Sequence, residues 1–94
     1  MQYRNFHVNI TVGARGSAEH FTRSIFVADI GAGTRRAARE VIRARYGARR
    51  VALGSGSVVD APRKGCETVG AKALKAESAR QNRVKKANQT AKAA

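Results

Sequence analysis

The sequence has few aromatic residues, one proline, one cysteine and no long apolar run. Aromatic residues make up 5% of the 94 residues, and tryptophan is absent. The longest unbroken apolar stretch is the segment from Ile25 to Ala28, far shorter than the ~20 residues of a membrane-spanning helix. The polar segment 1–5 lacks the apolar core of a secretory signal. We therefore expect a protein of the cytoplasm or nucleoid that is not secreted and has no membrane partner.

Residues for metal binding and catalysis are also scarce. The single Cys66 excludes an intramolecular disulfide and a multi-cysteine zinc site, and the two histidines, His7 and His20, are far apart. The six acidic residues are scattered, so no carboxylate pair for acid–base catalysis is evident. Ser55 and Ser57 do not have the spacing of a nucleophile elbow. Cys66 has no obvious histidine partner. We predict no metal site, no cofactor and no enzymatic activity.

Positive charge is what the sequence has in excess. There are 19 Lys+Arg against 6 Asp+Glu, which gives a formal net charge of +13. Residues 1–62 contain ten Arg, no Lys, four acidic residues and all five aromatics, a net charge of +6. Residues 63–94 contain three Arg, six Lys and two acidic residues, a net charge of +7. With Pro62 at the junction, this division predicts a folded body over 1–62 and a basic extension over 63–94.

Two strands begin the predicted body. From Tyr3 to Val12, apolar and polar residues alternate, which is typical of a half-buried strand. A glycine-containing loop over 13–20 precedes a second β-rich run, Phe21 to Ile30, so we predict an antiparallel hairpin. On this second run we assign Ile25 and Val27 to the core. Phe26 then either lies on the open sheet face, where with Tyr3 it would offer a stacking platform, or packs against the extension or the core, which we favour.

A helix is predicted from Arg35 to about Tyr46. Thr34 is the expected N-cap, and Gly47 suits the position after the last turn. At about 100° per residue, the apolar residues fall on one side, namely Ala37, Ala38, Val41, Ile42 and Ala44.

Residues 49–54 read as a third strand, with Ser55-Gly56 as a turn into a weak fourth strand over 57–60. The predicted fold class is therefore α+β, a small antiparallel ββαβ sheet with one helix on a single face. The extension has good helix formers but only Leu74 and Val84 as large aliphatic groups. Alone in water it should be frayed, and it would become helical against a partner or against the body.

The helix arginines are the most informative candidates for binding. Arg36, Arg39 and Arg43 are spaced so that they project from the same side of the helix. Together with Arg35 they make four positive charges against one negative charge, that of Glu40. A solvated helix face normally mixes charges of both signs, so this imbalance favours phosphate contact. Ile30-Gly-Ala-Gly33-Thr34 precedes the helix and could also supply amides for one phosphate, although simple capping is the more common role. It lacks the third glycine of a dinucleotide motif.

The remaining candidates are loop and extension cations that suit sequence-independent phosphate neutralisation. Together with the helix arginines, the full predicted set is Arg15, Arg35, Arg36, Arg39, Arg43, Arg49, Arg50, Arg63, Lys64, Lys72, Lys75, Arg80, Arg83, Lys85 and Lys86.

These features predict a small basic protein that binds nucleic acid or a nucleoprotein through phosphates. RNA is slightly favoured over DNA, because of the arginine-rich helix, the open sheet and the lack of a helix-turn-helix pattern. The alternative is an inhibitor or adaptor, of the phage-encoded anti-CRISPR kind, that docks on an acidic or nucleic-acid-binding surface of a host nucleoprotein. No resemblance is strong enough to name a family, and the architecture does not choose between these functions.

Overall fold

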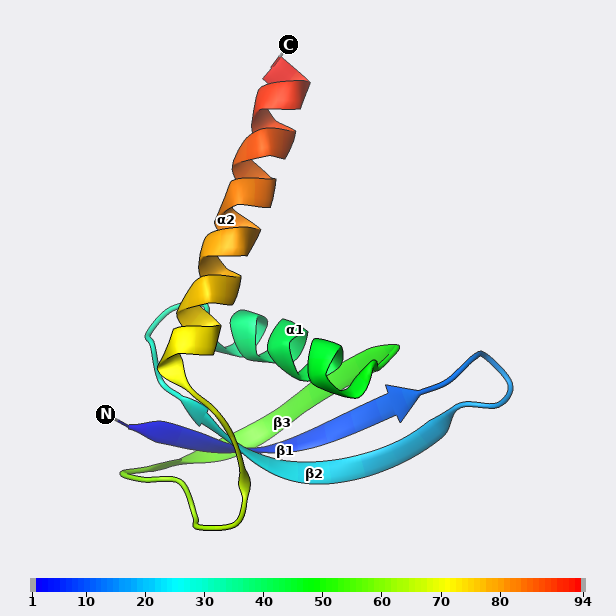
Figure 1. Cartoon of the computed structure of the whole chain (residues 1–94), viewed down its shortest axis with the longest axis vertical. Coiled ribbons are helices and arrows are strands. Elements are labelled where there is room, and N and C mark those ends of the chain that lie inside the picture. Colours follow the sequence, from blue (N-terminus) through cyan, green and yellow to red (C-terminus); the bar gives the residue numbers. More distant parts are fainter. Residues whose placement is uncertain (1, 94) are drawn as a thin grey trace.

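The protein folds into a four-stranded sheet that carries two helices on one face (Figure 1). The computed structural model describes residues 2–93, and side chains as far as Val84. The elements are β1 (Tyr3–Val12), β2 (Glu19–Ala28), α1 (Thr34–Tyr46), β3 (Arg50–Val59), β4 (Glu67–Val69) and α2 (Ala71–Ala93). The strand order is β3-β1-β2-β4. The predicted α+β class is confirmed. The sheet is mixed rather than purely antiparallel, however, because β4 pairs with β2 in parallel.

The predicted hairpin forms the centre of the sheet. Strands β1 and β2 pair antiparallel from Tyr3 opposite Ala28 to Val12 opposite Glu19. Phe6, Val8 and Ile10 are buried on the helix side, while the intervening polar residues are exposed, as period-two alternation predicts. Ile25 and Val27 of β2 are also fully buried, which confirms their assignment to the core.

Phe26 is buried on the face away from the helices. It lies between Ile25 and Val27 in an extended strand, so its side chain points to the opposite face. It is nevertheless only 4% exposed. The connection from β3 to β4, residues 60–66, crosses the sheet on this side (Figure 1), and Pro62 and Cys66 on it are half-buried. The stacking platform considered for Phe26 is therefore wrong, because the ring is covered.

Strand β3 continues through the predicted turn at Ser55-Gly56. Between the pairs Val8–Leu53 and Phe6–Gly56 the register shifts by one extra residue on β3, which is a β-bulge. A Cβ built at Gly56 would lie 2.6 Å from the Asn5 carbonyl oxygen. Glycine is needed there for close approach of β1, not for a turn. The weak fourth strand predicted over 57–60 is the end of β3, and the actual fourth strand is β4.

Helix α1 begins one residue earlier than predicted. Its N-cap is Gly33 and not Thr34, and no side chain caps the first turn. The Thr34 hydroxyl instead donates to the Gly31 carbonyl (2.6 Å) and accepts from the Ile30 amide (3.1 Å), which closes the loop before the helix. Gly47 ends the helix as predicted, with φ of 59°. On the apolar side, Ala44 is the one predicted residue that is exposed.

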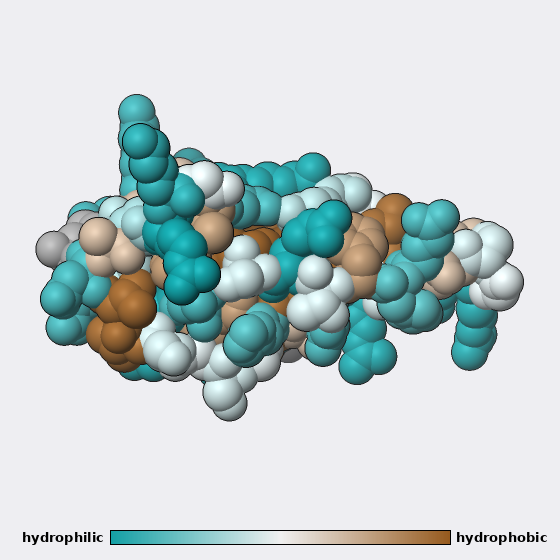
Figure 2. Space-filling model, turned by 90° about the horizontal axis from the view of Figure 1, so that it is seen from below, coloured by the Kyte–Doolittle hydropathy of each residue, from teal (hydrophilic) through white to brown (hydrophobic). Residues whose placement is uncertain are grey.

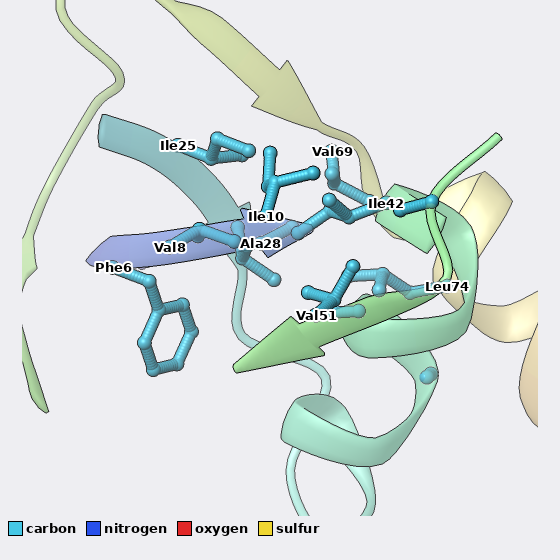
Figure 3. Packing of buried hydrophobic residues seen from close by; sticks show 13 residues of the cluster. Phe6, Val8, Ile10, Ile25, Ala28, Ile42, Val51, Val69 and Leu74 are labelled. Atoms are coloured by element: carbon cyan, nitrogen blue, oxygen red, sulfur yellow. The ribbon is translucent and has the colours of Figure 1, made fainter. Parts of the chain in front are cut away.

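The packed unit does not end at residue 62, where the body was predicted to end. Val69 of β4 and Leu74 of α2 are both fully buried among the side chains of the main core, as Figure 3 shows. The first turns of α2 contact α1 and β2, and the rest of this helix extends away from the body (Figure 1). A second helix therefore packs on the sheet through its first turns, where Leu74 is buried, as expected for an extension that is held by the body.

Candidate nucleic-acid interface

An open groove between α1 and β3 brings together arginines from two separate segments. Its volume is about 620 Å³, and it is lined by Arg39, Glu40 and Arg43 of α1, by Arg49, and by residues Arg50, Val51, Ala52 and Leu53 of β3. We call this feature the arginine groove. Four cationic side chains and one carboxylate line it, so its electrostatic potential favours an anion.

The chain reversal after α1 positions the β3 side of the arginine groove. Gly47 in the left-handed conformation directs its amide to the Ala44 carbonyl, and the Ala48 amide donates to the Arg43 carbonyl at 2.9 Å. This is the double hydrogen bond of a Schellman ending. The next amide, that of Arg49, donates to the Thr11 carbonyl of β1 at 2.8 Å. Arg49 and Arg50 are thereby held beside the last turns of α1.

Glu40 neutralises only part of the charge in the arginine groove. Its carboxylate accepts from Arg43, with Nε and Nη2 of Arg43 both 3.1 Å from Oε2. Within the part of the chain whose side chains are described, Arg39, Arg49 and Arg50 form no ion pair and no side-chain hydrogen bond, and all three are exposed. Three guanidinium groups therefore remain available, and each can make planar bidentate contacts with phosphate oxygens.

The outer ridge of α1 extends this basic surface. Arg36, Arg39 and Arg43 are all exposed, as their spacing predicts. Arg36 is not among the residues that line the arginine groove. It lies one turn before Arg39 and continues the ridge toward the start of the helix.

Arg35 is committed to packing within the body. Its Nη1 donates to the Leu53 carbonyl at 3.0 Å, and its guanidinium carbon lies 5.3 Å from the centre of the Phe6 ring. These contacts hold the exposed Arg35 beside Phe6, in the pocket next to the loop before α1 and not among the residues that line the arginine groove. The structure therefore separates Arg35 from the other helix arginines.

The loop before α1 is poorly suited to the phosphate considered there. A small pocket beside it is lined by Arg4, Phe6, Asp29, Gly31, Gly33, Thr34 and Arg35. The Asp29 carboxylate accepts the Gly31 amide at 2.9 Å, and the Thr34 amide donates to the Gly31 carbonyl at 3.3 Å. Two amides are thus occupied, and the Asp29 carboxylate, 3.9 Å from Arg4 Nε, already pairs with one of the two arginines that line this pocket.

Other predicted cations are dispersed around the molecule. Arg15 lies at the hairpin tip, and Arg63 and Lys64 lie on the connection that crosses the face away from the helices. Lys72, Lys75 and Arg83 are exposed on α2. Arg80 forms a bidentate pair with Glu77, with distances of 2.6 and 2.9 Å. The side chains of Lys85 and Lys86 lie outside the described residues.

An ionisable network joins the end of α1 to β4. The Tyr46 hydroxyl donates to Glu67, and Arg45 donates to the Thr68 carbonyl at 2.9 Å and pairs with Glu67 at 3.4 Å. The hydrogen bond to Glu67 raises the pKa of Tyr46, and burial raises it further. Tyr46 also packs edge-on against Phe21, with ring centres 5.8 Å apart. This network fixes the helix end from which the arginine groove is built.

The face of the sheet away from the helices is polar and uncharged along the hairpin. Figure 2 shows this side of the molecule, where hydrophilic and pale residues cover most of the surface. Side chains pair across β1 and β2: Ser24 donates to Asn5 at 2.5 Å, Thr22 donates to Asn9 at 2.9 Å, and Thr11 lies 3.0 Å from His20. These groups largely satisfy one another.

Sequence reasoning identified the arginines but not the surface that joins them. The side of the arginine groove formed by Val51, Ala52 and Leu53 carries no chemical signal in the sequence, because it depends on α1 lying beside β3. Among the residues described, no three His, Cys, Asp or Glu side chains are grouped as a metal site would require.

Comparisons with protein-family models, with curated proteins and with solved structures found no match. Within the described range, none of the helices has both the length and the apolar character needed to cross a membrane. The geometry and charge of the arginine groove are therefore the features that bear on function.

Proposed function

We propose that this chain is a non-enzymatic nucleic-acid-binding protein that holds backbone phosphates in the arginine groove. One observation carries the proposal: α1 and β3 place Arg39, Arg49 and Arg50 along one open groove without carboxylate partners among the described residues. Phosphate diesters present repeated oxygen pairs at regular spacing, and exposed guanidinium groups bind such oxygens bidentately.

The arginine groove favours contact with the backbone over contact with bases. Stacking on single-stranded bases needs exposed aromatic rings, and Phe26 is buried while Phe21 is packed against Tyr46. The open sheet face therefore gives less support to the RNA preference than the sequence suggested. Phosphates are common to RNA and DNA, so the proposal covers both and leaves the choice to the experiment.

Fluorescence anisotropy of labelled single-stranded RNA, duplex RNA and duplex DNA, titrated across salt concentrations, tests the proposal. The test variant replaces Arg39, Arg49 and Arg50 with Gln. The matched control replaces Arg15, Arg63 and Lys64 with Gln, which removes the same charge outside the arginine groove.

We expect salt-sensitive binding by the natural protein. Loss of about three phosphate contacts should make the slope of log affinity against log salt shallower by about 2.7 on duplex DNA. At about 1 kcal/mol for each exposed contact, affinity should fall about a hundredfold at low salt. The control variant should lose much less.

Two results would contradict the proposal. Equal losses in the test and control variants would mean that net charge, not the arginine groove, governs binding. No binding to any of the three nucleic acids at low salt would redirect the search to an acidic protein or an assembled nucleoprotein.

A further inference from the structure

Helix α2 presents a second basic surface that α1 does not cover. Leu74 is fully buried, and Glu77, Ser78 and Gln81 are partly buried, so these positions mark the side of α2 that faces the body. At about 100° per residue, the opposite side carries residues that are all exposed: Lys72, Lys75, Ala76, Ala79, Asn82 and Arg83. We call these six residues the outer stripe.

The outer stripe combines cations with small side chains. Lys72, Lys75 and Arg83 carry charge, whereas Ala76 and Ala79 lie between them and allow close approach of the helix backbone to another surface. The nearest carboxylate on this helix, that of Glu77, lies on the body side and is engaged by Arg80. The stripe therefore has unopposed positive charge along its described length.

The length and exposure of α2 favour a polyanion that can surround a single helix. A 23-residue helix is about 34 Å long, and most of this helix stands clear of the body (Figure 1). Beyond Leu74, the one large aliphatic residue among its described side chains is Val84, which is 48% exposed, and like charges along the helix repel. A polyanion that fits around a single helix would relieve this repulsion.

We infer that the outer stripe of α2 enters the major groove of B-form duplex DNA. That groove is about 12 Å wide and admits an α-helix, whereas the major groove of A-form RNA is too narrow and deep to do so. Lys72, Lys75 and Arg83 then reach phosphates on the groove walls while the alanines face its floor. This inference deepens the proposed function and rests on it, because both require nucleic acid as the partner.

The test compares duplex DNA and duplex RNA of the same sequence by fluorescence anisotropy, with the full-length protein. One variant replaces Lys72, Lys75 and Arg83 with Gln, and a second, Ala79→Trp, keeps the charge but blocks close approach. The control for charge is the Arg15, Arg63 and Lys64 variant described above. Arg80→Gln is a control for position on α2. Circular dichroism verifies that each variant keeps its helices.

The natural protein should bind duplex DNA about tenfold more tightly than duplex RNA, since an inserted helix gains contacts worth at least ~1.4 kcal/mol. The outer-stripe variant and Ala79→Trp should each abolish this preference. Methyl green, which occupies the major groove, should displace the protein, while the minor-groove ligand netropsin should not.

Equal affinity for the two duplexes would overturn the inference, as would Ala79→Trp binding DNA like the natural protein. Both results leave the proposed function intact, because the arginine groove would still bind phosphates and its variant would still lose affinity. Failure of the proposed function has different signatures, namely no binding of the natural protein to any nucleic acid, or equal losses in the arginine-groove variant and its charge-matched control.

Discussion

The buried side chain of Leu74 offers a test of whether α2 belongs to the folded unit. Leu74 is fully buried, although it lies in the segment that the sequence presents as a basic extension. Truncation of a buried leucine to alanine costs about 2–5 kcal/mol, of which part is transfer free energy and part is the cavity left behind. For Leu74→Ala we take about 3 kcal/mol, a large share of the roughly 5–10 kcal/mol expected for a chain of this size.

The expected effect is large enough to measure by two independent methods. At about 4–8 °C for each kcal/mol, Leu74→Ala should lower the midpoint of thermal unfolding by about 12–24 °C. Urea denaturation should give the same free-energy change. Because α2 accounts for 23 helical residues against 13 in α1, its detachment would also reduce the helical signal at 222 nm before global unfolding.

Val84→Ala is the matched control, since Val84 lies on the same helix but is 48% exposed. It should change the free energy of unfolding by less than about 0.5 kcal/mol. If Leu74→Ala were no more destabilising than Val84→Ala, α2 would not be packed on the body. The packed unit would then end with β4, whose Val69 is also buried.

Three further predictions concern the body. Phe26→Ala should lower the free energy of unfolding in urea by about 3–4 kcal/mol because the ring is buried, while anisotropy of the remaining folded protein should show unchanged RNA affinity. Weaker RNA binding without destabilisation would instead indicate that Phe26 stacks on bases. Gly47→Ala should cost about 1 kcal/mol because its φ is 59°, whereas Gly70→Ala should not, because Gly70 is not among the glycines with positive φ. Equal thermal midpoints would refute the need for glycine at the helix end. The pKa of Tyr46 is raised in the folded protein, so the contribution of Tyr46 to stability is fully present below pH 10 and is lost as the pH rises through the folded value. Urea denaturation should therefore show a steeper alkaline loss of stability for the natural protein than for Tyr46→Phe. Identical profiles would contradict the hydrogen bond to Glu67.

Local patterns in the sequence were sufficient for the central elements. Strand β1 alternates from Asn5 to Val12, and helix α1 combines an apolar side with Gly47 at its end, so both were predicted within about a residue. These signals are strong because each is repeated over eight or more residues.

Elements that depend on contacts distant in sequence were not predictable in the same way. Strand β4 has three residues and one buried side chain, Val69, and only its pairing with β2 makes it a strand. The sequence around Gly56 predicts a turn, but a glycine inside a strand also permits close approach of a neighbouring strand. The sequence cannot distinguish these two uses.

In the candidate site, too, local spacing was predictable and contacts between distant segments were not. The spacing of Arg36, Arg39 and Arg43 predicted a shared exposed side of α1, which the structure has. It did not reveal that Arg35 packs on Phe6 or that Arg49 and Arg50 complete a groove with α1, because these relations arise from the crossing of α1 beside β3.

Binding of nucleic-acid phosphates in the arginine groove can be observed residue by residue in an NMR titration of the labelled protein with a short oligonucleotide duplex. The side-chain Nε–H resonances of Arg39, Arg49 and Arg50 should shift together and saturably, while those of Arg15 and Arg63 should move little. Shifts confined to the open sheet face, or equal small shifts at every arginine, would contradict the proposed site.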